Sequence, residues 1–135
     1  MLFKDLGLSP EVVEAIESIG YSEATPIQEK TIPILMTGKD LTGQAQTGTG
    51  KTAAFGIPAI EHVDISINQT QSLILCPTRE LALQVATELK KISKFKKGLR
   101  VLAVYGGESI ERQIKDLKFG AHIVVGTPGR IIDHL

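Results

Sequence analysis

The stretch that decides the fold is Ala45-Gln46-Thr47-Gly48-Thr49-Gly50-Lys51-Thr52, which lies between a strand predicted at residues 41–44 and a helix predicted from Lys51. Its small residues allow successive backbone N–H groups to turn inward around phosphate oxygens, and the start of the helix adds partial positive charge. Lys51 is then expected to reach the β- and γ-phosphates of a nucleoside triphosphate, and the Thr52 hydroxyl to bind magnesium. The alternative is a glycine-rich turn that merely precedes a helix, but Gly-Lys-Thr in a strand-to-helix setting favours the phosphate loop.

Apolar and amphipathic segments alternate along the rest of the chain. Two helices are predicted before the loop. Ser9 is expected to cap the first, which opens at Pro10 and stops at Gly20. The second starts at Thr25-Pro26 and runs toward Leu35, with a kink at Pro33. After the loop, strands are predicted at residues 72–76, 101–105 and 123–125, and helices at residues 109–117 and from Thr127-Pro128 onward. A long helix with the core stripe Leu81, Val85, Leu89 and Ile92 follows the first of these strands.

This order of elements predicts an α/β fold in which helices cover both faces of a parallel sheet. The continuous apolar run Leu73-Ile74-Leu75 is typical of a strand that is buried on both faces. The last predicted helix has only begun when the sequence stops at Leu135, so we expect the domain to be incomplete at its C-terminus.

Composition narrows the class of protein. The chain has 135 residues, 42% of them hydrophobic, and its 15 basic and 15 acidic residues create no overall field that would attract nucleic acid or a membrane. Cys76 is the one cysteine, which fits a reducing cytosol, and His62, His122 and His134 lack the spacing of metal ligands. With no apolar run of signal or membrane-span length, a soluble cytoplasmic protein is expected.

The phosphate loop resembles motif I of the DEAD-box RNA helicases, and other segments resemble motifs of the same family in the same order. These are Gly20-Tyr21 through Ala24-Thr25-Pro26-Ile27-Gln28 for the Q motif with Phe3 upstream, Pro77-Thr78-Arg79-Glu80-Leu81-Ala82 for motif Ia, Gly106-Gly107 for the glycine pair, and Thr127-Pro128-Gly129-Arg130 for motif Ib. The resemblance implies the N-terminal part of a RecA-like domain, with residues 1–38 as the Q-motif region and residues 39–135 as the phosphate-loop sheet core.

The sequence departs from the family in two respects. Ala24 stands where the family often has proline, which is a minor change. The Asp-Glu-Ala-Asp motif, the Ser-Ala-Thr motif and the second RecA-like domain do not occur in these residues. In the family these parts supply the catalytic groups, so the resemblance implies binding roles here and no complete catalytic set.

The resemblance implies an ATP–magnesium site formed by Phe3, Tyr21, Gln28, Ala45, Gln46, Thr47, Gly48, Thr49, Gly50, Lys51 and Thr52. Tyr21 would stack on the base and Phe3 would support the site, although both could equally be core aromatic residues. The amide of Gln28 could pair with the edge of adenine and so select ATP over GTP. Thr25 and Gln28 also have the spacing of a capping box, and the residues alone leave the two roles open; the resemblance favours adenine.

The resemblance also implies an RNA site at the carboxyl ends of three predicted strands. Its residues are Pro77, Thr78, Arg79, Glu80, Gly106, Gly107, Thr127, Pro128, Gly129 and Arg130. Such loops would hold the sugar-phosphate chain of one RNA strand without distinguishing its sequence. Each loop taken alone is a capped helix start or a surface turn, and it is their recurrence at successive strand ends that favours binding.

Residues 88–100 hold Lys90, Lys91, Lys94, Lys96, Lys97 and Arg100 against one acidic residue. This segment could bind nucleic acid, but cations at the C-terminus of a helix also favour the helix dipole, and we interpret it as a solvated face. Cys76 is interpreted as a buried strand residue without a chemical role.

The leading hypothesis is an ATP-dependent RNA helicase of the DEAD-box family that locally unwinds RNA duplexes. These 135 residues alone are expected to bind nucleotide weakly and to hydrolyse none. Two alternatives stay open: another phosphate-loop ATPase or kinase with a small-molecule substrate, and a non-catalytic adaptor that binds nucleotide or RNA.

Overall fold

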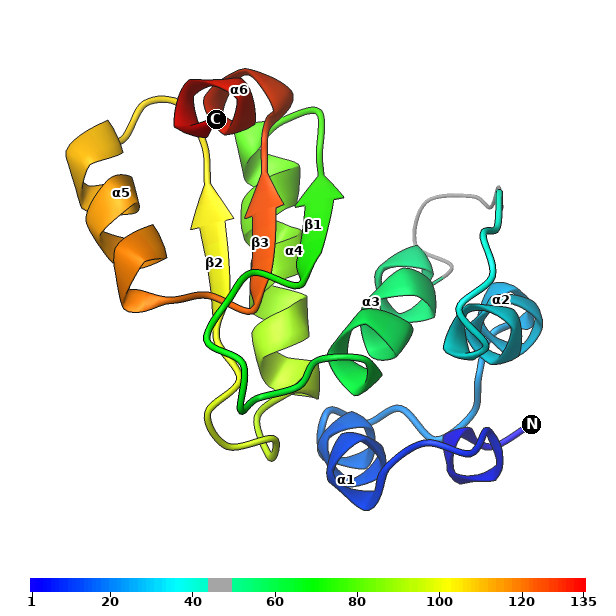
Figure 1. The fold of residues 1–135 in the computed structure, drawn as a ribbon. Helices are drawn as coiled ribbons and strands as arrows, with labels where there is room; N and C mark the ends of the chain where they lie inside the picture. The colour runs from blue at the N-terminus through cyan, green and yellow to red at the C-terminus, as the bar shows by residue number, and fades with distance from the viewer. Residues whose placement is uncertain (44–49) are drawn as a thin grey trace. The chain divides into compact units, whose positions relative to one another are not determined.

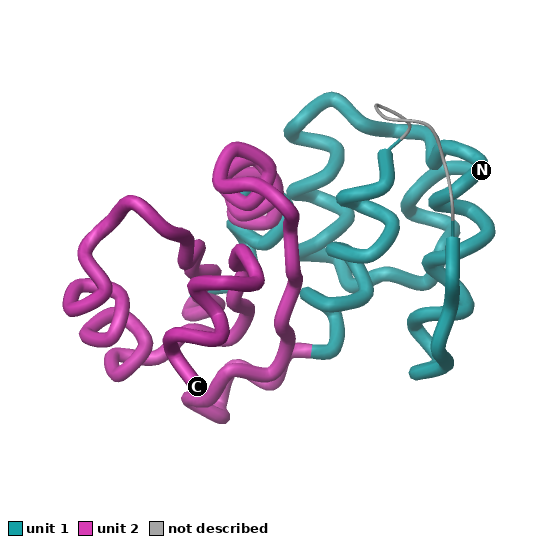
Figure 2. The backbone as a smooth tube through the Cα atoms, turned by 90° about the horizontal axis from the view of Figure 1, so that it is seen from above, with its two compact units in different colours: residues 1–62, 91–97 teal, residues 63–90, 98–135 magenta. Residues whose placement is uncertain are grey.

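The computed structural model describes residues 1–43 and 50–135 (Figure 1). The chain divides into two compact units (Figure 2). The first unit comprises residues 1–62 and 91–97, and the second comprises residues 63–90 and 98–135.

The first unit is helical. A short 3-10 helix, η1 (Phe3–Asp5), precedes α1 (Pro10–Ser18), α2 (Pro26–Met36) and α3 (Lys51–Glu61). Proline opens α1 and α2 because the first helical position needs no N–H donor. These helices lie where the sequence predicted them, and α2 continues through Pro33 to Met36; the kink stays a prediction. The core of the unit includes Val12, Ile16, Ile32, Ile57 and Ile60, all essentially inaccessible to solvent.

Ser9 stands at the N-cap position of α1, but its side chain makes no capping bond to that helix. Instead its backbone N–H and its hydroxyl donate to the two carboxylate oxygens of Glu61, at 3.0 and 2.6 Å. The predicted capping role of Ser9 is therefore wrong: its hydroxyl is turned toward the Glu61 carboxylate, which is a strong acceptor, and makes no bond to the first N–H groups of α1.

The second unit contains a three-stranded parallel sheet in the order β1-β3-β2. Its elements follow one another as β1 (Ser72–Leu75), α4 (Arg79–Ile92), β2 (Val101–Val104), α5 (Ile110–Phe119), β3 (Ile123–Gly126) and α6 (Pro128–His134), and only the last two residues of α4 are counted with the first unit. Leu73 and Leu102 both pair with Val124 in register. The predicted α/β fold with a parallel sheet is confirmed.

Helices lie on both sides of this sheet. α4 lies behind the strands in Figure 1, and its residues Val85 and Leu89 are buried. On the other face, Leu117 of α5 and Ile131 of α6 pack against a cluster that includes Val104 and Val124. The carboxyl ends of all three strands point toward α6, so the loops that follow them lie at one edge of the sheet (Figure 1).

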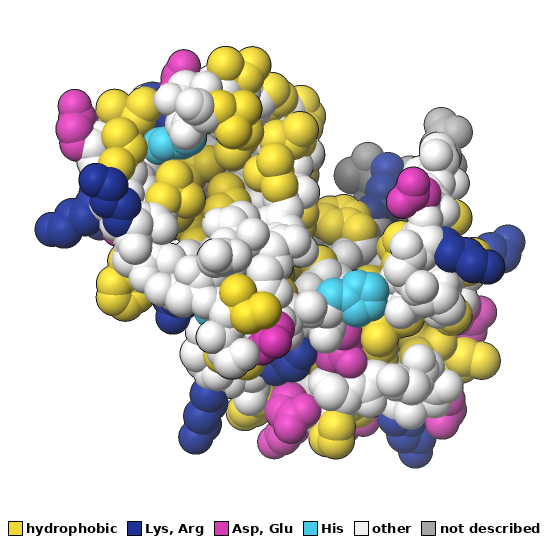
Figure 3. Space-filling model, in the orientation of Figure 1, with side chains coloured by type: hydrophobic (Ala, Val, Ile, Leu, Met, Phe, Trp, Pro, Cys, Tyr) yellow, Lys and Arg dark blue, Asp and Glu magenta, His cyan; other side chains and the backbone are white. Residues whose placement is uncertain are grey.

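Three expectations about single segments are wrong. Residues 41–43 form no strand, because the described part of the first unit contains no strand that could pair with their backbone groups. Leu73 and Leu75, which were expected to be buried, are 52% and 56% exposed, because β1 is an edge strand of the sheet. Hydrophobic side chains are visible over this face of the sheet in Figure 3. Leu81, in the first turn of α4, is also exposed.

Candidate functional site

The start of α3 carries the described part of the predicted phosphate loop. Gly50 precedes the helix with φ +87°, in the left-handed region that favours glycine. A Cβ at Gly50 would overlap Nε2 of Gln28 and would lie 3.2 Å from Oγ1 of Thr25. Lys51 is exposed at the first turn, where helix N–H groups lack intrahelical acceptors and attract anions. Ala45, Gln46, Thr47, Gly48 and Thr49 lie outside the described residues.

Gln28 joins the start of α2 to the start of α3. Its side chain is buried, Oε1 accepts from the Thr25 backbone N–H at 2.8 Å, and Nε2 donates to the Gly50 carbonyl at 3.1 Å. The first bond belongs to the capping box that the sequence predicted as the alternative role. An amide oxygen has two lone pairs and an amide nitrogen two hydrogens, so among the described residues these bonds leave one acceptor and one donor position of Gln28 unused. Capping and adenine recognition are therefore compatible.

The Thr25 side chain forms the other half of this capping box, with the Gln28 backbone N–H directed at its hydroxyl. The fit of the residues present to a bound nucleotide therefore rests on two features. These are the spare capacity of the Gln28 amide and the N–H groups at the start of α3, which lack intrahelical acceptors.

A cavity of about 340 Å³ lies between α2 and α3. It is lined by Ile27, Thr31, Leu35, Leu41, Gly43, Lys51, Ala54 and Phe55. Neither Gln28 nor Tyr21 is among these residues. The cavity and the predicted adenine contacts therefore do not coincide, although Lys51 of the predicted phosphate loop lines the cavity.

The two predicted aromatic residues have different surroundings. Phe3 is 1% exposed, and its backbone N–H donates to the Ser22 carbonyl at 3.1 Å, so it is a core residue that joins the N-terminal segment to the loop before α2. Tyr21 is 43% exposed, which leaves its ring accessible to a base.

In the second unit, the loops after β1 and β2 meet through Arg79 and Tyr105. The Arg79 guanidinium lies 5.1 Å from the centre of the Tyr105 ring, in a cation–π contact. Gly107 has φ +89°, and a Cβ there would lie 3.2 Å from Nη1 of Arg79. Thr78 accepts from the Leu81 N–H at 3.2 Å and so caps α4. Pro77, Glu80 and Gly106 are exposed beside these residues.

The loop after β3 leads into α6, where Pro128 and Gly129 are exposed and Thr127 is half-buried. The side chain of Arg130 is only 13% exposed. Its Nη1 donates to the Glu108 carbonyl and to Oε1 of Gln113, each at 3.1 Å. The Arg130 guanidinium is thus directed at protein groups, whereas the sequence had suggested a direct contact with RNA.

Sequence reasoning missed Tyr105, Gln113 and His134. His134 Nε2 lies 3.0 Å from Oε1 of Gln113, and the Gln113 amide also donates to the Tyr105 carbonyl at 3.0 Å. A signal was present, because Gln113 interrupts the apolar stripe formed by Ile110, Ile114 and Leu117.

The basic segment contains both solvated and bonded side chains. Lys91, Lys94 and Lys97 are exposed, whereas Lys96 donates to the Ile60 carbonyl at 3.1 Å. Arg100 donates from Nε to the Gly120 carbonyl at 2.6 Å and lies over the Phe119 ring at 5.1 Å. The interpretation as a solvated face stays a prediction.

The histidine and cysteine side chains are candidates for metal ligands or reactive groups. Burial raises the pKa of the Cys76 thiol, which lies directly after β1. His122 is buried, and its Nδ1 accepts from the Arg100 N–H at 3.0 Å. Among residues 1–43 and 50–135, no group of three or more His, Cys, Asp or Glu could hold a metal ion. Within the same residues, no helix is long and apolar enough to cross a membrane.

The sheet and its flanking helices define a parallel α/β domain of the RecA-like class. The model of the DEAD/DEAH box helicase family matches residues 25–135, and the chain belongs to that family. The resemblance seen in the sequence is thereby confirmed.

Two curated relatives are similar over nearly the whole chain. The DEAD-box ATP-dependent RNA helicase CshA of Geobacillus kaustophilus (strain HTA426) is 59% identical over 133 residues, which cover 98% of this chain and 28% of that protein. The ATP-dependent RNA helicase CshA of Listeria monocytogenes serovar 1/2a is also 59% identical, over 98% of this chain and 25% of that protein. The chain thus spans about a quarter of the length of these relatives.

Solved structures give the same assignment. The crystal structure of a DEAD box protein from Methanococcus jannaschii has a TM-score of 0.93 and 48% identity, and the match covers 99% of this chain and 36% of that one. A hypothetical ATP-dependent RNA helicase from Sulfolobus tokodaii has a TM-score of 0.84 and 39% identity, with 93% and 36% coverage.

Proposed function

We propose that this chain is the ATP- and RNA-binding portion of an ATP-dependent RNA helicase that locally unwinds RNA duplexes. The proposal is carried by the hydrogen bond between Gln28 and Gly50, at 3.1 Å. That bond brings an amide with spare donor and acceptor positions to the helix start that precedes Lys51 and Thr52. Family membership supports it.

In this proposal the first unit holds ATP together with magnesium. When bound, ATP supplies the phosphoanhydride bond that is hydrolysed. Lys51 provides positive charge for the β- and γ-phosphates, and Thr52 provides a hydroxyl ligand for the metal. The amides at the start of α3, with those of Ala45, Gln46, Thr47, Gly48, Thr49 and Gly50, hold phosphate oxygens. Gln28 recognises the adenine edge, and Tyr21 stacks on the base.

The second unit binds one RNA strand along its sugar-phosphate chain. The exposed loops at one edge of the sheet present Arg79, the Gly106-Gly107 backbone and the backbone of Thr127-Pro128-Gly129. The guanidinium and the backbone N–H groups are donors that suit the phosphate oxygens shared by every nucleotide, so we expect binding to be independent of sequence. Pro77, Thr78, Glu80 and Arg130 shape the loops around these contacts.

Hydrolysis requires groups beyond these residues. The acidic residue that holds magnesium, the residue that positions the attacking water and the arginines that stabilise the transition state come from other parts of such helicases. We therefore expect a second RecA-like domain to complete the site when ATP and RNA are both bound.

The test uses the complete gene product and a fluorescent single-stranded RNA. RNA affinity is measured by anisotropy with and without a non-hydrolysable ATP analogue, and ATP turnover with and without RNA. Analogue-dependent RNA binding and RNA-stimulated turnover are expected. Indifference to RNA would instead favour another phosphate-loop ATPase, and RNA-stimulated turnover by residues 1–135 alone would contradict the need for further catalytic parts.

A further inference from the structure

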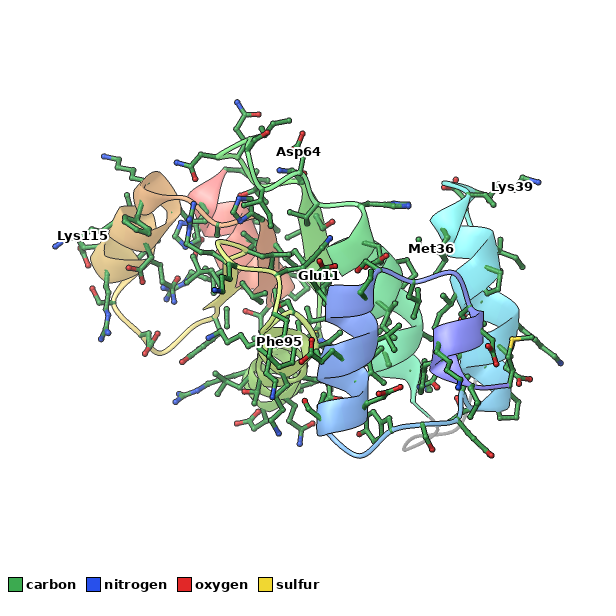
Figure 4. All side chains as sticks on the ribbon, turned by 90° about the horizontal axis from the view of Figure 1, so that it is seen from below. Glu11, Met36, Lys39, Asp64, Phe95 and Lys115 are labelled. Atoms are coloured by element: carbon green, nitrogen blue, oxygen red, sulfur yellow. The ribbon has the colours of Figure 1, made fainter. Side chains whose placement is uncertain are left out.

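α5 carries one buried polar side chain. Gln113 is 2% exposed, whereas the other side chains of this helix are exposed or half-buried. Lys115, two positions further on, extends away from the helix at the outer side of the unit (Figure 4). Burying an amide raises the free energy of the folded state unless its donors and acceptor are paired. The partners of the Gln113 side chain should therefore explain why an amide occupies this buried position.

The Gln113 amide has three partners. Nε2 donates to the Tyr105 carbonyl at 3.0 Å, while Oε1 lies 3.1 Å from Nη1 of Arg130 and 3.0 Å from Nε2 of His134. A carbonyl can only accept and a guanidinium can only donate, so the orientation of the amide is fixed by its surroundings. His134 accordingly donates from Nε2. A leucine of similar size would satisfy none of these groups.

These partners follow two different strands: Tyr105 lies in the loop after β2, and Arg130 and His134 lie in α6, which follows β3. Tyr105 directly precedes Gly106-Gly107, and Arg130 is the last residue of Thr127-Pro128-Gly129-Arg130. Nη1 of Arg130 also donates to the Glu108 carbonyl, at 3.1 Å. The guanidinium is therefore held between the Gln113 side chain and the backbone that follows the glycine pair.

The third loop is connected through the same tyrosine. The Tyr105 ring lies 5.1 Å from the Arg79 guanidinium, and the Tyr105 carbonyl is the acceptor for Gln113. A shift of Tyr105 would move both the platform under Arg79 and the start of the glycine pair. Gln113 thus contacts a residue that links the loops after β1 and β2.

We propose that Gln113 is a positioning residue for RNA binding. Through the Tyr105 carbonyl and Arg130 it holds the glycine pair and the start of α6 at the spacing that a sugar-phosphate chain requires. The inference rests on the proposed RNA-binding function of the second unit. Gln113 is buried and does not touch the RNA, so it acts only through the groups that it orients.

The first test is Gln113→Leu in the complete gene product, with Gln69→Leu as the matched control. Gln69 is exposed in the loop before β1, and its substitution makes the same chemical change without disturbing a buried amide. RNA-stimulated ATP hydrolysis is titrated with a uridine oligonucleotide. The KM for RNA is expected to rise about tenfold, with kcat within about twofold and unchanged ATP affinity without RNA, because displaced contacts weaken binding more than chemistry.

Two further variants keep the test decisive if Gln113→Leu does not fold. Gln113→Glu retains an acceptor for Arg130 but loses the donor to the Tyr105 carbonyl, so its KM for RNA should lie between those of wild type and Gln113→Leu. In an Arg130→Ala background, Gln113→Glu should raise the KM for RNA by more than it does alone, because the new carboxylate is then buried without the guanidinium that it would pair with.

The proposal is overturned if Gln113→Glu and the leucine variant leave the KM for RNA at the wild-type value. It is also overturned if RNA affinity, ATP affinity and melting temperature fall together, which is the result of a purely structural role. Wild-type protein without RNA stimulation would refute the proposed function itself. Normal stimulation in both wild type and variants would refute only the role of Gln113.

Discussion

The side-chain amide of Gln28 donates to the backbone carbonyl of Gly50 at 3.1 Å, although the two residues are 22 positions apart in the sequence. This bond joins the N-terminus of α2 to the N-terminus of α3 inside the first unit. Two segments that carry separate sequence signals, Thr25-Pro26-Ile27-Gln28 and Gly50-Lys51-Thr52, therefore meet at one place. The relationship makes both ends of the bond open to experiment.

Replacing Gln28 by alanine is expected to relax the preference for ATP over GTP. The change removes the amide that can distinguish the adenine edge. It also leaves the Thr25 N–H and the Gly50 carbonyl without their partner, which should lower the free energy of unfolding by about 1–3 kcal/mol. The measurement is the ratio of ATP to GTP affinities, together with a denaturant titration.

The matched control for this change is Gln69→Ala, in which an exposed amide is removed from the second unit. An unchanged nucleotide ratio in the Gln28 variant, with the expected loss of stability, would return Gln28 to a capping role alone.

Gly50→Ala is expected to impair nucleotide binding more than stability alone explains. The left-handed backbone at φ +87° costs a residue with a side chain about 1–2 kcal/mol, and the new methyl group would displace the Gln28 amide. Gly43→Ala is the control, since its Cβ would lie at an ordinary 3.6 Å from Ile27. Equal nucleotide affinity in the two variants, measured by calorimetry, would contradict this prediction.

Much of this fold could be predicted because the residues that start its helices and form its strands act locally. Proline after Ser9, Thr25 and Thr127 correctly predicted the starts of α1, α2 and α6. The apolar runs correctly predicted the strands of the sheet. These signals depend on φ restraint and on burial, both of which act within a few residues.

The features that sequence reasoning missed depend on neighbours that are distant in the chain. The exposure of Leu73 and Leu75 depends on the position of β1 at the edge of the sheet, which no local pattern reveals. The partners of Gln113 come from two other segments, so its interruption of an apolar stripe could be seen without its purpose being known. The predicted capping by Ser9 failed for the same reason, because the Glu61 carboxylate to which its hydroxyl donates lies 52 positions away in the sequence.

Lys51→Ala is expected to reduce ATP turnover of the complete gene product at least about 100-fold, because it removes charge from the site of phosphoryl transfer. Lys51 is exposed and belongs to no ion pair within the described residues, so the free energy of unfolding should change by less than about 0.5 kcal/mol. Lys39→Ala, another exposed lysine of the first unit, is the control. Full activity in the Lys51 variant would defeat the phosphate-loop assignment.

Arg79→Ala is expected to weaken RNA binding and to reduce the slope of log affinity against log salt by about one, as for the loss of one phosphate contact. Arg79→Lys should keep that slope, because charge is retained, yet still bind RNA less tightly because the planar stack on Tyr105 is lost. Anisotropy titrations at several salt concentrations measure both quantities. An unaltered slope in the alanine variant would mean that Arg79 only supports the tyrosine.

Cys76 should react slowly with alkylating reagents, and its rate should still be rising at a pH where free thiols are already fully reactive. The thiolate is the nucleophile, and burial raises the pKa of this thiol by disfavouring the charged form, so less thiolate exists at any given pH. The unfolded chain releases the proton first, so the free energy of unfolding should decrease as the pH rises above about 8.5. Iodoacetamide labelling of the Cys76 peptide, followed by mass spectrometry between pH 7 and 10 in native and denaturing buffer, measures the difference, with glutathione as the free-thiol control. Native Cys76 that reacts as fast as glutathione at every pH would show that the thiol is accessible and its pKa unshifted.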